Sequence, residues 1–178
     1  MIFLFSKSNK LGSRLIKWGL DEPVSHFAMV FDERPGGYGI LFHSHFQGVG
    51  IQWFNDWQKD NEIVYAYAVK PAPTVLQEEQ VYQVFVRNFY GKPYDFQSMA
   101  YWAWRLFLYK YYGKQVPVEN AWGSPTKYLC YEIAEGFNYV QFLGLPAFNP
   151  GCMISPYKLK LMFDESPNLI DVSDMYRG

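Results

Sequence analysis

The sequence predicts a single α+β domain over residues 1–178, with a mostly antiparallel sheet packed on helices. Two observations predict this class. Alternating apolar and polar residues dominate about the first 70 positions, and helical periodicity follows in the middle of the chain. The chain shows no internal repeat and no linker, and its 178 residues can bury one substantial core. Aromatic residues are 20% of the chain, which favours a core built from Phe, Tyr and Trp over disorder.

The strand pattern is clearest in "PVSHFAMVFD", residues 23–32. Phe27, Met29 and Phe31 fall on one face of this strand, and His26 falls on the other, at the strand's mouth. The following "DERPGG" is a strong turn signal and predicts a hairpin. Further strands are expected over residues 38–46, 49–54 and 62–69.

Helix signals begin where the strand signals end. Thr74 has the capping-box spacing to Gln77, and "YGKP" stops the helix that they begin. An aromatic helix follows "YDF", with Asp95 as its expected N-cap. A third helix is expected from Ser124 through "GSPTKYLCYEIAEGF", with Leu129, Ile133 and Phe137 on one face. A short leading helix is expected over residues 10–20, and the tail from residue 149 onward reads as loops with short ordered pieces.

Charge and hydropathy exclude several classes of protein. A net charge of −1, without a Lys/Arg run among the aromatics, predicts that the chain does not bind nucleic acid. The opening "MIFLF" is too short for a signal peptide, so a cytoplasmic protein is expected. "SMAYWAWRLFLYKYYG" is interrupted by Arg105 and Lys110 and is shorter than the roughly 20 residues of a membrane span. It is interpreted as a buried aromatic helix, the alternative being a helix that contacts a membrane surface.

The two cysteines, Cys130 and Cys152, are too few for a disulfide framework, so free thiols are expected. Cys130 falls near the start of the third expected helix, where unpaired N–H groups and a partial positive charge favour a thiolate. A lowered pKa and a nucleophilic role are therefore expected for Cys130. Cys152 lies in an expected loop and is interpreted as structural or incidental.

His26 is the expected base for this nucleophile. If residues 33–37 form the turn, facing positions of the hairpin sum to about 70, so His26 faces position 44 with an uncertainty of one. His43, Ser44 or His45 can then orient its ring. The same histidines allow a rival interpretation, a zinc site on His26, His43 and His45 with an open position, although no carboxylate partner is evident.

With these residues in view, the chain resembles the circularly permuted papain-fold cysteine peptidases and amidases of the NlpC superfamily, relatives of the lecithin retinol acyltransferases. The matching pieces are "SHFAMVFD", "LFHSHFQGVGI", "GKPYDF", "YLCYEIAEGF" and "ISPYKL". They occur in the order of the permuted branch and cover roughly residues 20 to 160, with the strands before the cysteine.

The resemblance implies a permuted papain-like fold and a thiol hydrolase. Cys130 would be the nucleophile, His26 the base and His43 the polar third member, with His45 in its place if the register slips. The N–H of Cys130, and Tyr94 or Tyr128, are candidate oxyanion donors. A peptide, a cell-wall peptide or a lipid-like acyl group is the expected substrate, and no cofactor or metal is expected. Such chains are expected in bacteria and in phage particles, and the alternative function is an inactive binding or virion-structural module on the same fold.

Overall fold

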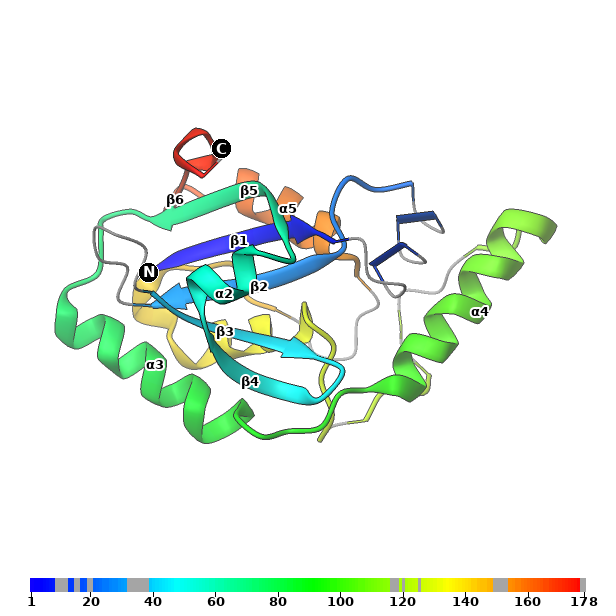
Figure 1. The fold of residues 1–178 in the computed structure, drawn as a ribbon, viewed down its shortest axis with the longest axis horizontal. Coiled ribbons are helices and arrows are strands. Elements are labelled where there is room, and N and C mark those ends of the chain that lie inside the picture. Colours follow the sequence, from blue (N-terminus) through cyan, green and yellow to red (C-terminus); the bar gives the residue numbers. More distant parts are fainter. Residues whose placement is uncertain are drawn as a thin grey trace.

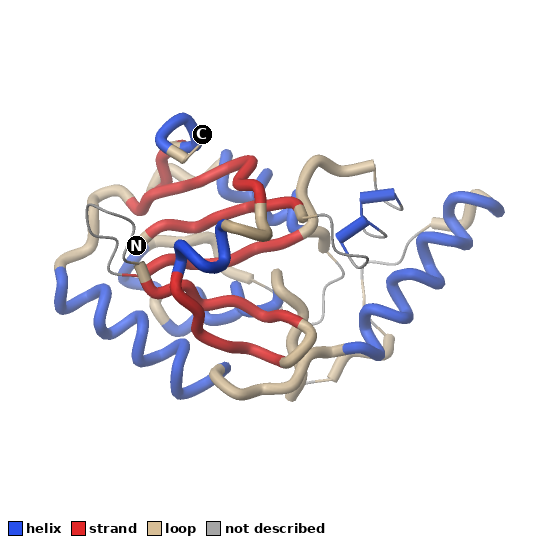
Figure 2. The backbone as a smooth tube through the Cα atoms, viewed as in Figure 1, coloured by secondary structure: helices blue, strands red, loops and turns tan. Residues whose placement is uncertain are grey.

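A computed structural model gives the arrangement of the chain. It describes residues 1–8, 13–14, 17–18, 21–31, 39–115, 119, 121–124, 126–148 and 154–176. Within these residues the chain forms one α+β domain, in which a six-stranded antiparallel sheet is covered by helices (Figures 1 and 2). The predicted α+β class is therefore confirmed, and so is the antiparallel pairing of the strand that begins at His26 with the next strand, while the turn predicted at residues 32–37 lies outside the described residues.

The sheet has the strand order β4-β3-β2-β1-β5-β6. Four strands correspond to predicted ones, and two, β1 and β6, were not expected. β1 is formed by the opening apolar run of the chain and lies between β2 and β5. It lacks polar alternation because Leu4 packs on one face of the sheet while Phe3 and Phe5 pack on the other. The strands are β1 Ile2–Lys7, β2 His26–Phe31, β3 Ile40–His45, β4 Gly48–Trp53, β5 Glu62–Val69 and β6 Leu169–Asp171.

Two of the predicted helices are confirmed together with their caps. Helix α3, Val75–Phe89, begins with a capping box in which the Gln77 N–H donates to Thr74 Oγ1 at 3.3 Å and the Thr74 N–H donates to Gln77 Oε1 at 2.8 Å. Helix α4, Phe96–Tyr112, begins at Asp95, whose Oδ1 accepts from the Ser98 N–H at 3.0 Å. Of the leading helix expected over residues 10–20, residues 13–14 and 17–18 are helical and the rest lie outside the described residues.

The third predicted helix is wrong in its start and in its type. A 3₁₀ helix, η1, begins at Glu132 and ends at Tyr139, after Cys130 instead of around it. Tertiary hydrogen bonds explain the difference, because they hold Tyr128 beside Pro93 and Tyr94 in an isolated parallel bridge. The Tyr128 N–H donates to the Pro93 carbonyl at 3.1 Å, and Ser44 Oγ donates to the Tyr128 carbonyl at 2.8 Å. These bonds occupy backbone groups that a helix from Ser124 would need.

The tail carries more structure than loops. Helix α5, Pro156–Asp164, is capped by Ser155 Oγ, which accepts from the Lys158 N–H at 3.1 Å. Leu159 and Phe163 are four residues apart and bury one face of the helix. The remaining helical segments are α2 Phe54–Gln58, η2 Gln141–Leu143 and η3 Ser173–Met175.

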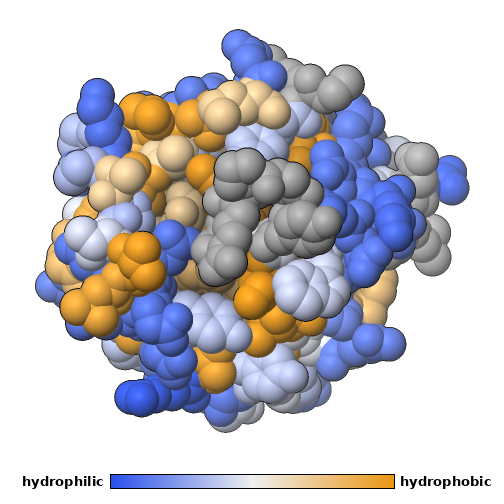
Figure 3. Space-filling view, turned by 60° about the vertical axis from the view of Figure 1, so that its left-hand side comes forward, coloured by the Kyte–Doolittle hydropathy of each residue, from blue (hydrophilic) through white to orange (hydrophobic). Residues whose placement is uncertain are grey.

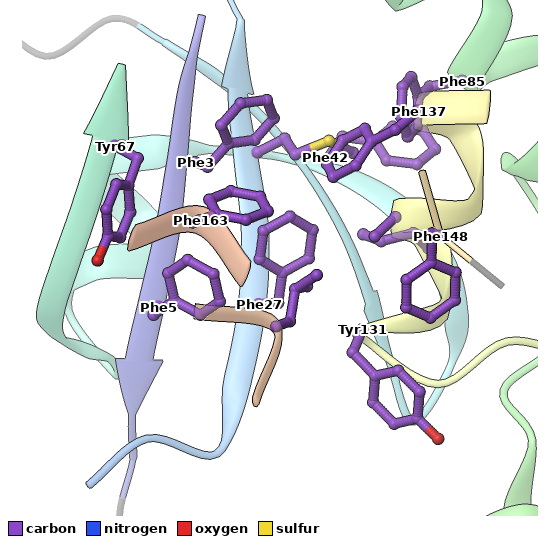
Figure 4. Close-up of a cluster of buried hydrophobic side chains, with 14 of the residues drawn as sticks. Phe3, Phe5, Phe27, Phe42, Tyr67, Phe85, Tyr131, Phe137, Phe148 and Phe163 are labelled. Atoms are coloured by element: carbon purple, nitrogen blue, oxygen red, sulfur yellow. The ribbon is translucent and has the colours of Figure 1, made fainter. Parts of the chain in front are cut away.

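The core lies on both faces of the sheet. On one face, an aromatic cluster joins the strands to α3, α5 and η1, and Phe163 meets the rings of Phe3 and Phe5 with centroid distances of 5.2 and 5.3 Å (Figure 4). On the other face, Ala28 and Val30 pack beneath Phe54 and Trp57 of α2. The predicted apolar face of β2, with Phe27 at its start, belongs to the aromatic cluster. The opposite face of β2 is also apolar because α2 covers it.

The outer surface carries both apolar and hydrophilic residues (Figure 3). On the face drawn in Figure 3, apolar residues are scattered among hydrophilic ones. Within the described ranges of the chain, no helix combines the length and the apolar character needed to cross a bilayer.

Phe163→Ala should lower the free energy of unfolding by about 3–5 kcal/mol, because it removes a buried ring from the centre of the aromatic cluster. Leu161→Ala, at a position of α5 that is 43% exposed, should cost less than about 1 kcal/mol and serves as the matched control. Urea unfolding followed by circular dichroism measures both. Equal losses would show that α5 does not seal the core.

Candidate active site

A cavity of about 500 Å³ opens at the end of the sheet where β2 begins and β3 ends. Cys130, His26 and His43, the three residues predicted as catalytic, all line it. Its wall also includes polar side chains such as Gln52 of β4 and Asn61. The fold therefore brings together residues that are far apart in the sequence.

The histidines form a cluster on one face of the hairpin. Ala28 faces His43 in the ladder, so facing positions sum to 71 (28 + 43) and position 45 continues this register opposite His26. His43 lies diagonally across from His26, and His26 Nε2 is 3.1 Å from His43 Nδ1, a hydrogen bond whose direction depends on the tautomers. The rings of His43 and His45 have centroids 4.8 Å apart.

Cys130 is buried beside the backbone of His26. Its thiol donates to the carbonyl oxygen of Ser25 at 3.9 Å, and backbone N–H groups of Phe27 and Tyr131 interact with the sulfur. Burial raises the pKa of the Cys130 thiol to about 11, and the Glu132 carboxylate adds to this rise, while the N–H groups oppose it. The expected low pKa is therefore wrong. No α-helix begins at Cys130, so the helix N-terminus that was expected to stabilise a thiolate is missing there.

The two sides of the site come from opposite faces of the sheet. Alternation along β2 places His26 on the face of Ala28 and Trp57, and the His26 and Trp57 ring centroids are 6.1 Å apart. Leu129 and Tyr131, which flank Cys130, belong to the aromatic cluster on the other face. His26 and Cys130 therefore do not face each other over one face of the sheet. Both line the cavity at the end of the sheet where β2 begins.

Glu132 was not expected to take part in the site, yet it shapes the turn that contains Cys130. Its Oε2 accepts from the Leu129 N–H at 2.6 Å, across the cysteine, and the side chain is buried. Burial raises the pKa of Glu132 to about 7. The signal available in the sequence was the Cys-x-Glu spacing, which places an acid where it can bond back over the turn.

Asp95 and Tyr94 connect the start of α4 to the same turn. Asp95 is fully buried, and besides capping α4 its Oδ2 accepts from the Ser124 N–H at 3.2 Å. Tyr94 lines the cavity, and burial raises the pKa of its hydroxyl, with the nearby Cys130 as a further cause. Tyr128, the other expected oxyanion donor, packs its ring against Phe89 with a centroid distance of 5.0 Å.

A metal site on the histidines does not follow from the geometry. Across the described ranges, which include all three histidines, no group of three or more His, Cys, Asp or Glu side chains is arranged to hold a metal ion. The second thiol, Cys152, lies outside the described residues.

No protein-family model matches the chain, and no curated protein matches it. Among solved structures, the fold is similar to that of the metalloprotein yiiX from Escherichia coli O157:H7, a DUF1105 protein, with a TM-score of 0.54 and 17% sequence identity. The similarity covers 96% of this chain and 94% of that chain. At this level of identity it shows a shared fold and nothing about the chemistry.

Glu132→Gln should change how stability depends on pH. Because burial raises the pKa of Glu132 from 4.5 to about 7, the folded protein binds more protons than the unfolded chain between these values, and stability falls as pH rises through this window. Gln keeps an acceptor for the Leu129 N–H without the charge. Relative to the wild type, the variant should gain about 2.5 kcal/mol of unfolding free energy between pH 5 and pH 8.

Urea unfolding at the two pH values measures this difference. Glu79→Gln, which removes a carboxyl at an exposed position of α3, is the control and should change stability by less than about 0.5 kcal/mol. A difference between wild type and Glu132→Gln that does not depend on pH would show that the Glu132 carboxyl titrates normally.

Proposed function

We propose that the protein is a cysteine hydrolase that cleaves an amide or ester through an acyl-enzyme, with Cys130, His26 and His43 as its catalytic residues. One observation carries the proposal: all three residues line one cavity, and His26 Nε2 lies 3.1 Å from His43 Nδ1. A histidine held by a second polar side chain has a defined tautomer and ring orientation, which is what a general base requires.

The proposed reaction has two steps. In the first, His26 takes the thiol proton while the Cys130 sulfur attacks the substrate carbonyl, and His26 then gives that proton to the departing amine or alcohol. In the second, water attacks the thioester, His26 takes a proton from the water, and the carboxylic acid leaves as the thiol is restored. The Cys130 N–H and the Tyr94 hydroxyl are the candidate donors to the oxyanion.

The raised pKa of Cys130 determines how this reaction begins. At a pKa of about 11, the resting sulfur is a thiol at neutral pH, so proton removal must accompany attack. His26 therefore acts as a general base toward a bound substrate, and a standing thiolate–imidazolium pair is not needed. The contacts of the sulfur with the Ser25 carbonyl and the Phe27 N–H hold it against the backbone on both sides of His26.

The fold and the substrate belong to the same proposal. The order of the pieces, with histidine strands before the cysteine, supports a permuted papain-like fold. The cavity wall offers hydroxyl and amide groups, including Ser25, Gln52 and Asn61, that suit a peptide, a cell-wall peptide or another acyl substrate with polar groups beside the carbonyl.

An inactive binding module is the second candidate, and the burial of Cys130 favours it. A thiol that is buried and has a raised pKa behaves as a small apolar residue unless a base activates it.

Acyl-enzyme formation distinguishes the two candidates. A simple activated ester should acylate Cys130 in the wild type, as seen by intact mass and peptide mapping, and Cys152→Ser should behave in the same way. Cys130→Ser should form no adduct, and His26→Ala should slow acylation by about 10²- to 10⁴-fold. Acylation that proceeds equally fast in His26→Ala, or only at Cys152, would favour the binding module.

The metal content of the protein is a separate test, because yiiX, whose fold is similar, is described as a metalloprotein. The described residues of this chain do not form a ligand group for a metal, and His26 and His43 bond to each other. Elemental analysis of the purified protein should therefore find no stoichiometric zinc. One zinc per chain that is lost in His45→Ala would overturn the cysteine mechanism in favour of a three-histidine site.

A further inference from the structure

Helix α4 exposes aromatic side chains along one side of its length. These side chains recur three, four or eight residues apart, so they project from the same face of the helix. Trp104 is 51% exposed and Tyr111 is 61% exposed. This aromatic row comprises Phe96, Trp104, Phe107 and Tyr111. The buried side of α4 comprises Ser98, Trp102 and Leu106. The helix expected to be buried is thus covered on one side up to Leu106, and its last turn, with Tyr109 and Tyr112 also exposed, is open all round.

The aromatic row has two parts, Phe96 beside the cavity and a group of touching rings further along α4. Phe96 stacks on Phe46, a residue of the cavity wall, with centroids 6.0 Å apart and planes inclined by 8°. Further along, Phe107 contacts Trp104 at 6.0 Å and Tyr111 at 4.8 Å. Figure 1 shows α4 extending from the body of the molecule on the side opposite α3. The row therefore leads outward from the mouth of the candidate active site.

The charges of α4 and of the three residues after it have one sign. Residues 96–115 contain Arg105, Lys110 and Lys114 and no Asp or Glu, although the whole chain has a net charge of −1. Lys110 Nζ lies 4.2 Å from the ring centroid of Trp18, which is itself half exposed and contacts Tyr111 at 6.5 Å. A basic side chain and two aromatic rings therefore lie together near the C-terminal end of α4.

We infer that α4 docks in the plane of an anionic membrane surface through the aromatic row. Trp and Tyr side chains concentrate at the boundary between lipid and water, where an apolar ring and a polar group are both satisfied. Basic side chains add attraction to anionic headgroups. A helix of this kind, with exposed aromatic rings and basic side chains, lies in the plane of the interface. A second copy of the chain fits less well, because pairing would bring equal positive charges together.

The exposed apolar pair Val75 and Leu76 provides a matched comparison. These residues open α3 and are 88% and 69% exposed, but Glu78 and Glu79 lie within four residues of them. Glu78 is paired with the Met1 ammonium at 3.2 Å, so the exposed Glu79 supplies the negative charge that repels an anionic surface, and apolar exposure alone does not predict docking here.

Vesicle flotation of the full chain tests the inference. The wild type should float with vesicles of phosphatidylcholine and phosphatidylglycerol, less with phosphatidylcholine alone, and less at high salt. The double substitution Trp104→Ser and Phe107→Ser should lower the partition coefficient roughly tenfold or more, since two interfacial rings are lost. Lys114→Glu should weaken flotation only with the anionic vesicles.

Three controls make the result specific. The Val75→Ser and Leu76→Ser double variant should float like the wild type, and circular dichroism should show that both double variants are folded. Cys130→Ser should also float normally, so a failure of the hydrolase proposal leaves this result unaffected. Wild-type protein that ignores both kinds of vesicle would overturn the inference. So would light scattering that shows a dimer which the Trp104 and Phe107 substitutions convert to a monomer.

Discussion

Both faces of the central strands are covered, and this constraint decides where the chemistry of the protein can lie. Phe3, Phe5 and Phe27 point into the aromatic cluster, while Leu4 and Ala28 point toward α2. No substrate can approach the middle of β1 or β2 over a face of the sheet, because close-packed side chains fill both layers. Within the described part of the chain, the cavity lies at an end of these strands. His26 is the first residue of β2, and the cavity opens where that strand begins.

Hydrogen bonds to other parts of the chain explain why the candidate nucleophile is buried and not presented by a helix. The segment around Cys130 is held by bonds to other parts of the chain, from Ser44 and Pro93 to Tyr128 and from Glu132 back to Leu129. In this segment the Cys130 sulfur lies against the backbone beside His26. This placement beside His26 raises the pKa of the Cys130 thiol, because burial disfavours the thiolate more than three backbone N–H groups favour it.

Local patterns predicted the elements that depend on neighbouring residues. The Thr74 box, the Asp95 cap and the antiparallel pairing of the strand from His26 need only nearby partners, and the structure confirms them. The opening run, by contrast, becomes a central strand only because layers from distant parts of the chain cover both its faces. The start expected at Ser124 failed for a similar reason, since hydrogen bonds from residues more than 30 positions away hold Tyr128 extended.

Some properties of the candidate site could likewise be predicted from the sequence, and others could not. Cys130, His26 and His43 could be selected from residue type, register and resemblance, and all three line the cavity. The register differs by one from the hairpin arithmetic, a sum of 71 in place of 70, and His43 reaches His26 diagonally, which the arithmetic of facing positions did not predict. The pKa of Cys130 could not be predicted, because its direction depends on burial by residues that the fold brings from elsewhere.

Asp95 connects the two unusual parts of the molecule, the exposed aromatic helix and the buried cysteine turn. One oxygen of its carboxylate accepts from the Ser98 N–H in the first turn of α4, and the other accepts from the Ser124 N–H in the segment that leads to Cys130. A fully buried carboxylate with both oxygens bonded is costly to separate from its partners. The orientation of α4 and the path of the chain into Cys130 are therefore set by one group. The cavity lies beside this group, with Tyr94 and Met99 on either side of it in the sequence contributing to the cavity wall.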